Sequence, residues 1–122
     1  MKEDVELVPV TQEFFRRRQW IDKHLPISHS TMALDVLVLA AHYTFAKEPI
    51  SSKELFHTLA YSEAGVRKHL RRFVAGGWLK IVKDERDSRV RLIVAEQKLL
   101  NAMREYANML LSSSLPPSLS RQ

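Results

Sequence analysis

The side chains of this sequence best suited to bind a ligand are cations, and they lie close together in the chain. Nine Arg or Lys and four Asp or Glu fall between positions 62 and 91, a difference equal to the net charge of +5, so the rest of the 122 residues is neutral. Such a concentration is typical of a surface that faces a polyanion, nucleic acid above all. Charge alone is equally consistent with a basic face that contacts only solvent.

The spacing of apolar residues after position 62 predicts a helix with two different sides. Val66, Leu70 and Phe73 recur at i, i+4 and i+7, so they share one side, which we expect to pack on a core. Ser62 is the predicted N-cap, and Gly76-Gly77 the predicted end. The opposite side is small or cationic and holds Ala64, Lys68, Arg71 and Arg72, with Arg67 at its edge.

A helix with such a cationic side is suited to the major groove of DNA, where Arg and Lys pair with guanine. We expect Lys68, Arg71 and Ala64 to face bases. Ser62 either holds a phosphate or only caps the helix. Phosphate contacts are expected from Arg67, Arg72, Lys80 and Arg91.

Two alternating segments, residues 79–81 and 90–94, predict a β-hairpin. The turn between them is polar, with the sequence DERDS over residues 84–88. Arg89 and Arg91 are expected to point outward. The inner side is expected to hold Leu79, Ile81, Val90, Leu92 and Val94.

Further helices are predicted before and after this region. One begins at the N-cap Thr11 and ends before Pro26, and a second, mostly apolar, runs from Ser28 or Ser30 to about residue 46. A capping box over residues 51–54 opens a short third helix, preceded by a minimal strand at Ile50, and a last helix covers about residues 96–111. The fold class is therefore mostly α with a small β-hairpin wing, a winged helix-turn-helix with flanking N- and C-terminal helices.

The predicted domain occupies residues 11–111. Residues 1–10 are expected to form a flexible lead-in closed by Pro9. Residues 112–122, rich in Ser and Pro, are expected to form a disordered tail.

Three segments resemble the recognition helix and wing of the MarR family of transcriptional regulators: residues 62–73 (SEAGVRKHLRRF), 77–79 (GWL) and 84–89 (DERDSR). The resemblance covers roughly residues 31–110. It implies a dimer that places recognition helices in successive major grooves and wing arginines in the adjacent minor groove. It also implies that Arg86 lies at the tip of the wing and that Asp87 orients Arg89.

The terminal helices carry more apolar surface than a core of this size requires, so we expect a homodimer built on them. The alternative is that both helices pack only on their own domain. The expected dimer contacts are Phe14, Phe15, Trp20, Leu99, Met103, Tyr106 and Leu110.

Several classes of protein are excluded by what the sequence lacks. With no cysteine there is no disulfide and no thiolate zinc site, and the five histidines show no metal-binding spacing, so no metal or cofactor is expected. No nucleophile motif or phosphate-binding glycine loop is present, so we expect no enzyme. The longest apolar run, residues 36–41, is too short to span a membrane, and from the charged start we expect no secretory signal. A cytoplasmic location is expected.

The leading hypothesis is a transcriptional regulator that binds double-stranded DNA. The family that the sequence resembles also allows a small-molecule effector, whose contacts the sequence does not identify. One alternative is a winged-helix module that binds an acidic protein or a partner subunit. Another is an architectural or plasmid-maintenance protein that binds DNA with little sequence preference.

Overall fold

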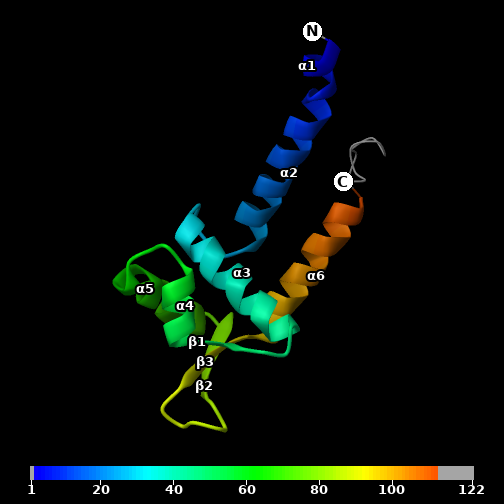
Figure 1. Cartoon of the computed structure of the whole chain (residues 1–122). Helices are drawn as coiled ribbons and strands as arrows, with labels where there is room; N and C mark the ends of the chain where they lie inside the picture. Colours follow the sequence, from blue (N-terminus) through cyan, green and yellow to red (C-terminus); the bar gives the residue numbers. More distant parts are fainter. Residues whose placement is uncertain (1, 113–122) are drawn as a thin grey trace.

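Six helices and a three-stranded antiparallel sheet make up the part of the chain that the computed structural model describes, residues 2–112. The strands lie in the order β1-β3-β2. α2 and α6 extend away from the sheet on the side opposite to the loop between β2 and β3 (Figure 1). This confirms the predicted winged helix-turn-helix with flanking terminal helices. In chain order the elements are α1 (Lys2–Glu6), α2 (Val8–His24), α3 (Thr31–Phe45), β1 (Ile50–Ser51), α4 (Ser52–Thr58), α5 (Glu63–Ala75), β2 (Leu79–Lys83), β3 (Arg91–Ala95) and α6 (Gln97–Leu111).

Three of these helices begin at a serine that caps them. The Oγ atoms of Ser30, Ser51 and Ser62 each accept a hydrogen bond, 3.1 Å long, from the backbone N–H three residues later. Each bond satisfies one of the amides that a helix start leaves without a partner. The Ser51 hydroxyl also donates to the Glu54 carboxylate at 3.1 Å, which confirms the predicted capping box. The two helices of the helix-turn-helix therefore start where local sequence predicts.

The first long helix begins earlier than predicted. α2 starts at Val8, and Thr11 does not cap it, because its hydroxyl instead donates to the Val8 carbonyl at 2.9 Å. Pro9 lies in the first turn, where its missing N–H costs no hydrogen bond and its fixed φ suits a helix. Apart from Leu7, residues 2–10 of the expected lead-in are helical. The expected tail lies outside the described residues from position 113 onward.

The core lies between α3, α5, the sheet and the first half of α6. Val66, Leu70 and Phe73 are buried, as their spacing predicts. Leu99 is also fully buried, so its assignment to a dimer interface is wrong. The physical reason is that the first turn of α6 follows directly after β3 and packs on the core, whereas the later turns of the helix extend beyond it.

The register of the sheet corrects the predicted inner side of β3. Ile93 pairs with Ile81, and Ile93 and Ala95 are buried, whereas Leu92 and Val94 are only half-buried. Arg91 therefore shares a side with Ile93 and lies beyond the edge of the core. The alternation of polar and apolar residues could not predict which side of β3 faces the core, because residues 92–94 are all apolar and β3 is the central strand. Arg89 was predicted to point outward and Val90 inward, but both residues precede β3.

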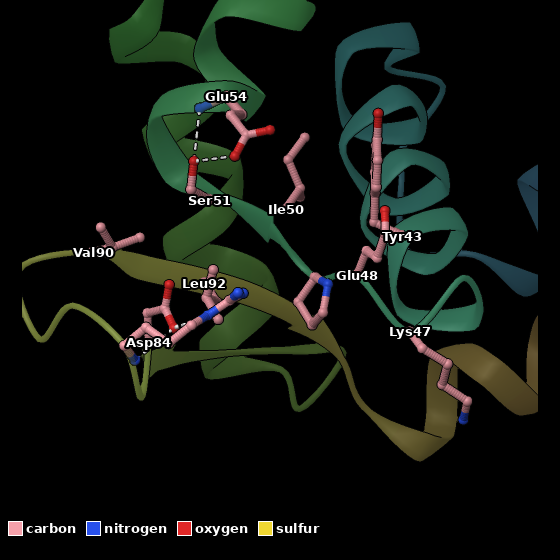
Figure 2. A pocket seen from close by; sticks show the side chains of 11 residues that line it. Tyr43, Lys47, Glu48, Ile50, Ser51, Glu54, Asp84, Val90 and Leu92 are labelled. Atoms are coloured by element: carbon pink, nitrogen blue, oxygen red, sulfur yellow. Dashed lines mark hydrogen bonds and ion pairs between the residues drawn. The ribbon is translucent and has the colours of Figure 1, made fainter.

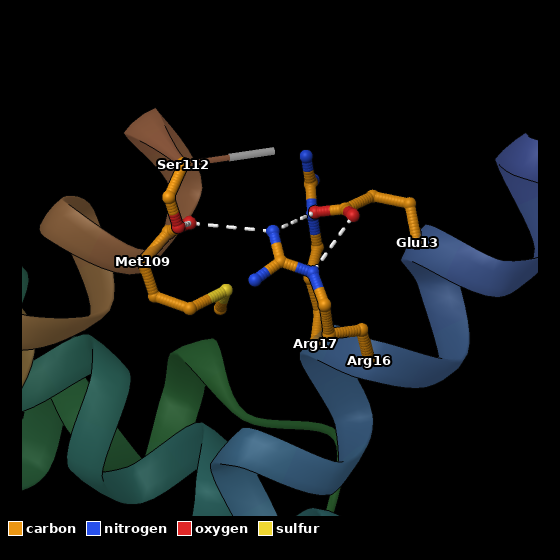
Figure 3. Close-up of polar contacts among 5 residues, drawn as sticks. All are labelled: Glu13, Arg16, Arg17, Met109 and Ser112. Atoms are coloured by element: carbon orange, nitrogen blue, oxygen red, sulfur yellow. Dashed lines mark hydrogen bonds and ion pairs between the residues drawn. The ribbon is translucent and has the colours of Figure 1, made fainter. Parts of the chain in front are cut away.

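A buried carboxylate on α2 holds an arginine that contacts α6 (Figure 3). Glu13 is only 3% exposed, because the guanidinium groups of Arg16 and Arg17 cover it, at 2.7 and 3.3 Å. Arg16 also donates to the Met109 carbonyl near the end of α6, at 3.3 Å. The hydrogen bond from Arg16 is the main cause that holds the pKa of the Glu13 carboxyl below its usual range, and Arg17 adds to it. The contact fixes the two helices side by side.

A second contact joins α6 to the end of α5. The Lys98 ammonium donates to the carbonyl of Gly76, the C-cap of α5, at 3.1 Å. The same ammonium lies 4.4 Å from the centre of the Trp78 ring. A cation at this position offsets the negative end of the helix dipole. Gly77 follows with φ of 78°, a backbone conformation that favours glycine.

Candidate nucleic-acid interface

The exposed side of α5 carries cations without counter-charges. Ala64, Lys68, Arg71 and Arg72 are exposed, opposite the buried side of the helix, as predicted. Among residues 2–112, neither an ion pair nor a hydrogen bond holds the side chains of the three cations. Their charges are therefore available to a polyanion.

Arg67 differs from these three cations because the protein already binds it. Its guanidinium pairs with Glu63 at 2.8 Å and lies 4.7 Å from the centre of the Phe56 ring. Glu63 offsets part of its charge, and the two contacts restrict its position. Of the two roles expected for Ser62, the structure shows the capping role, since its Oγ accepts from the Gly65 amide.

The wing presents two exposed arginines in different states. Arg89 forms a two-pronged ion pair with Asp87, at 3.1 and 3.2 Å, and Asp87 also accepts the Arg89 backbone N–H. These hydrogen bonds hold the pKa of the Asp87 carboxyl below its usual range. Arg86 is almost fully exposed: its backbone N–H donates to Asp84 at 3.0 Å, and its guanidinium lies 3.9 Å from the same carboxylate. Both arrangements agree with what the family resemblance implies.

A hollow of about 280 Å³ joins α5 to the base of the wing. Arg91 contributes to it from β3, held by a 2.8 Å hydrogen bond to the Ser88 carbonyl. The exposed side of α5 and the wing therefore share one cationic surface. The hollow is lined by Ser52, Phe56, Arg67, Leu70, Arg71, Ile81 and Arg91.

Lys80, a predicted phosphate contact, does not join this surface. It lies next to Ile81 in β2, and neighbouring strand residues point to opposite faces of a sheet. Its ammonium lies 3.7 Å from the Glu96 carboxylate at the start of α6. This pairing could not be predicted from local spacing, because Glu96 is sixteen positions away along the chain.

His69 is half-buried on α5, between the buried side of the helix and its cationic side. Its ring stacks on Phe73 with centroids 6.1 Å apart, and its Nδ1 is buried without a hydrogen-bond partner in the described residues. Burial, with smaller effects from Arg72 and Lys68, holds the pKa of the His69 imidazole below its usual range. Burial therefore favours the neutral form of His69 over the charged form.

A larger hollow of about 540 Å³ lies between β1 and the base of the wing (Figure 2). Asp84 lies on its wing side, and Glu54 and Tyr43 lie on its helical side. Carboxylates and cations are nearly balanced along its wall, so it selects neither sign of ligand charge. No group of three His, Cys, Asp or Glu residues able to hold a metal ion occurs within residues 2–112.

Two features of the terminal helices bear on assembly and ligand binding. Phe14 and Phe15 are 71% and 63% exposed, and Leu111 is 86% exposed. Four other residues expected at the dimer interface are half-buried: Trp20, Met103, Tyr106 and Leu110.

The first three of them line an apolar hollow of about 280 Å³ between α2, α3 and α6. The other residues of its wall are Ile21, Leu25, Leu34 and Val38.

Comparison with known proteins identifies this architecture. No protein-family model and no curated protein matches the sequence. Solved structures do match it. The MepR–DNA complex of S. aureus aligns over 84% of this chain and 82% of its own, with a TM-score of 0.62 and 13% identity. The chain shares the winged-helix fold of this solved structure.

Two further structures support the same fold. A probable transcriptional regulator from Pseudomonas aeruginosa aligns over 84% of this chain and 80% of its own, with a TM-score of 0.52 and 17% identity. The heme sensor protein PefR from Streptococcus agalactiae, solved in complex with heme, aligns over 94% and 78%, with a TM-score of 0.56 and 17% identity. The resemblance to the MarR family is thus confirmed for the fold. Within residues 2–112, no helix has the length and apolar character needed to cross a bilayer.

Proposed function

We propose that this chain is a transcriptional regulator that binds double-stranded DNA through α5 and the wing. The observation that carries the proposal is the continuous cationic surface formed by the exposed side of α5 and the base of the wing. A polyanion of regular shape is the ligand that such a surface fits. One of the matched structures, MepR, was solved with DNA.

In the proposed complex, α5 enters the major groove. Lys68 and Ala64 lie opposite the buried side of the helix, so they are the residues closest to base edges, and Lys68 pairs with guanine. Arg72 flanks them and contacts phosphate. The direction of α5 is fixed by the burial of Val66 and Phe73 on the core.

The wing arginines enter the adjacent minor groove. A narrow minor groove has a strong negative potential that attracts arginine. Arg86 is exposed at the projecting loop, and Arg89 is held by Asp87, so both are available to this groove.

The proposed regulator is a homodimer built on α2 and α6. Exposed aromatic side chains such as Phe14 and Phe15 are costly in water and are typical of an interface. Trp20, Met103, Tyr106 and Leu110 lie on the same two helices. A two-fold pair would present two α5 helices to a palindromic site.

The apolar hollow beside Trp20 and Tyr106 is the proposed site of an effector. Its wall contains almost no charge, so it suits a small apolar or aromatic molecule. It lies between α2 and α6, which build the proposed dimer, and α3, which packs on α5.

The proposal is tested by selecting duplexes from a random pool and measuring their affinity by fluorescence anisotropy at several salt concentrations. We expect enrichment of a palindromic sequence and an affinity that falls with salt, with a slope of about −0.9 per phosphate contacted. Uniform affinity for every duplex would indicate an architectural DNA binder instead. Absence of binding would favour a protein partner.

A further inference from the structure

The hollow between α4, α5 and the wing combines apolar and cationic walls. Ile81 is 45% exposed there, although its strand neighbours on the same side, Leu79 and Ile93, are buried. Phe56 from α4 lies across the same hollow. An exposed apolar side chain within a cationic surface needs a ligand with both carbon-rich and anionic parts to cover it.

Two of the three arginines in this hollow are held in place before any ligand arrives. Arg67 is fixed by Glu63 and Phe56, and Arg91 by the Ser88 carbonyl. Fixed donors lose little conformational freedom on binding, so more of their interaction energy contributes to affinity.

The charge of the hollow is not balanced by the protein. Glu63 pairs with Arg67, whereas Arg71 and Arg91 have no carboxylate within 4.0 Å among the described residues. Apolar side chains beside them reduce the local dielectric constant and strengthen the attraction for an anion. Two guanidinium groups that approach from α5 and β3 are suited to an oxyanion with several acceptor oxygens.

We propose that this hollow binds one sugar–phosphate unit of the DNA backbone, with the phosphate between Arg71 and Arg91 and the deoxyribose against Ile81. This inference rests on the proposed DNA-binding function. It assigns Arg71 to phosphate, whereas the sequence favours a base contact. It also assigns Arg71 and Arg91 to one shared phosphate instead of two separate phosphates.

The test uses the duplex selected from the random pool, with each phosphate in turn replaced by a neutral methylphosphonate. One position in each half-site should weaken binding of the unaltered protein by about tenfold, the loss expected for a charge-assisted hydrogen bond. The Arg71→Gln/Arg91→Gln double variant should be insensitive at that same position. Arg104→Gln, which removes an exposed arginine of α6, is the matched control and should keep the pattern of the unaltered protein.

Salt dependence separates a shared phosphate from two phosphates. Loss of one contact reduces the slope of log K against log salt concentration by about 0.9. Each single variant keeps one arginine on the shared phosphate, so its slope should stay close to that of the unaltered protein, whereas the double variant should lose about 0.9. Ile81→Ala should weaken binding without changing the slope. Thermal melting by circular dichroism confirms that each variant is folded.

Three results would overturn the inference. A double variant whose slope falls by about 1.8 would show two separate phosphates. Relaxed preference at one base pair with an unchanged slope would return Arg71 to the bases. A double variant that keeps the methylphosphonate pattern of the unaltered protein would remove the hollow from the interface and leave the proposed function intact. Failure of the unaltered protein to bind any duplex would instead refute the proposed function itself.

Discussion

Asp87 shows how a carboxylate can assist an anion-binding surface. By itself a negative charge on the wing weakens attraction to DNA. Asp87, however, holds the Arg89 guanidinium through two hydrogen bonds, which fixes the direction of an otherwise mobile side chain. The ordering of Arg89 by Asp87 therefore favours DNA binding, whereas the negative charge of Asp87 opposes it. Substitution of Asp87 separates the two effects.

Replacing Asp87 by Ala should weaken DNA binding by about threefold to tenfold, because the ordering of Arg89 is lost. Glu85→Ala is the matched control, since no residue among positions 2–112 pairs with Glu85. It removes the same charge and should strengthen binding slightly. Anisotropy titrations at one salt concentration make the comparison, and tighter binding by both variants would show that only charge matters.

Replacing Glu13 by Gln should lower the melting temperature by about 2–4 °C, because Arg16 and Arg17 lose their anionic partner. The pKa of Glu13 is lowered in the folded protein, so the stabilisation is present above the pKa of the unfolded chain and is lost as pH falls through the folded pKa. The difference between the two proteins should therefore disappear in strong acid. Melting curves from neutral pH to pH 2 test this, and a difference that persists at the lowest pH would refute it.

Residue types and spacing predicted the exposed side of α5 better than the buried contact of Glu13. The side of α5 followed from three apolar residues at helical spacing, since helix geometry alone places them together. Glu13 could not be found in this way. Arginines three and four positions after a glutamate are a local sign of pairing, but the bond from Arg16 to the Met109 carbonyl joins residues that are distant in sequence.

The C-terminal end of α5 contacts α6, although the whole hairpin of β2 and β3 separates them in the chain. Lys98 reaches from α6 to the Gly76 carbonyl and covers the Trp78 ring. This junction joins the C-terminal end of α5 to the first turn of α6. It therefore links the helix that carries the DNA-facing cations to the helix that carries part of the proposed dimer surface.

Replacing Lys98 by Met should lower the free energy of unfolding by about 1 kcal/mol, the sum of a modest helix-dipole effect and a cation–π contact. Met retains most of the apolar stem, so packing is preserved. Lys53→Met, on the exposed surface of α4, is the control and should be neutral. Urea denaturation gives both values, and equal stability of the two variants would exclude the junction as a source of stability.

Element boundaries followed from the sequence wherever a local signal existed. Serine caps gave the starts of α3, α4 and α5, and two glycines gave the end of α5. The inner side of β3 did not follow, because residues 92–94 are apolar on both sides and only pairing with β1 and β2 decides between them. The start of α2 was also mispredicted, since Thr11 has the type of a cap residue but Pro9 already fits a first turn.

The whole molecule has two ends with different chemistry. Cations cover α5 and the wing at one end, and exposed aromatic side chains lie on α2 at the other. The proposed DNA contacts and the proposed dimer contacts therefore do not compete for the same surface.

Replacing Phe15 by Glu should convert a dimer into a monomer, because a charge is introduced into an apolar interface. Analytical ultracentrifugation should give the mass of two chains for the unaltered protein and one chain for the variant. Affinity for a duplex with two half-sites should fall by more than about tenfold, since the half-sites are then bound independently. Val74→Glu, on α5, should keep the dimeric mass. An unaltered protein of single-chain mass would contradict the dimer.

The anchoring of α6 by Leu99 has a mechanical consequence. Fifteen residues at 1.5 Å each form a rod about 22 Å long, which the core holds at its first turn and which Arg16 of α2 contacts near its tip, so the two helices tilt together. Tilting such a rod by about 5° moves the tip by about 2 Å by lever geometry. In a two-fold assembly, a small change in the angle between the paired α6 helices would change the distance between the two halves of an operator that the dimer can bind. The preferred spacing of the half-sites would therefore report that angle.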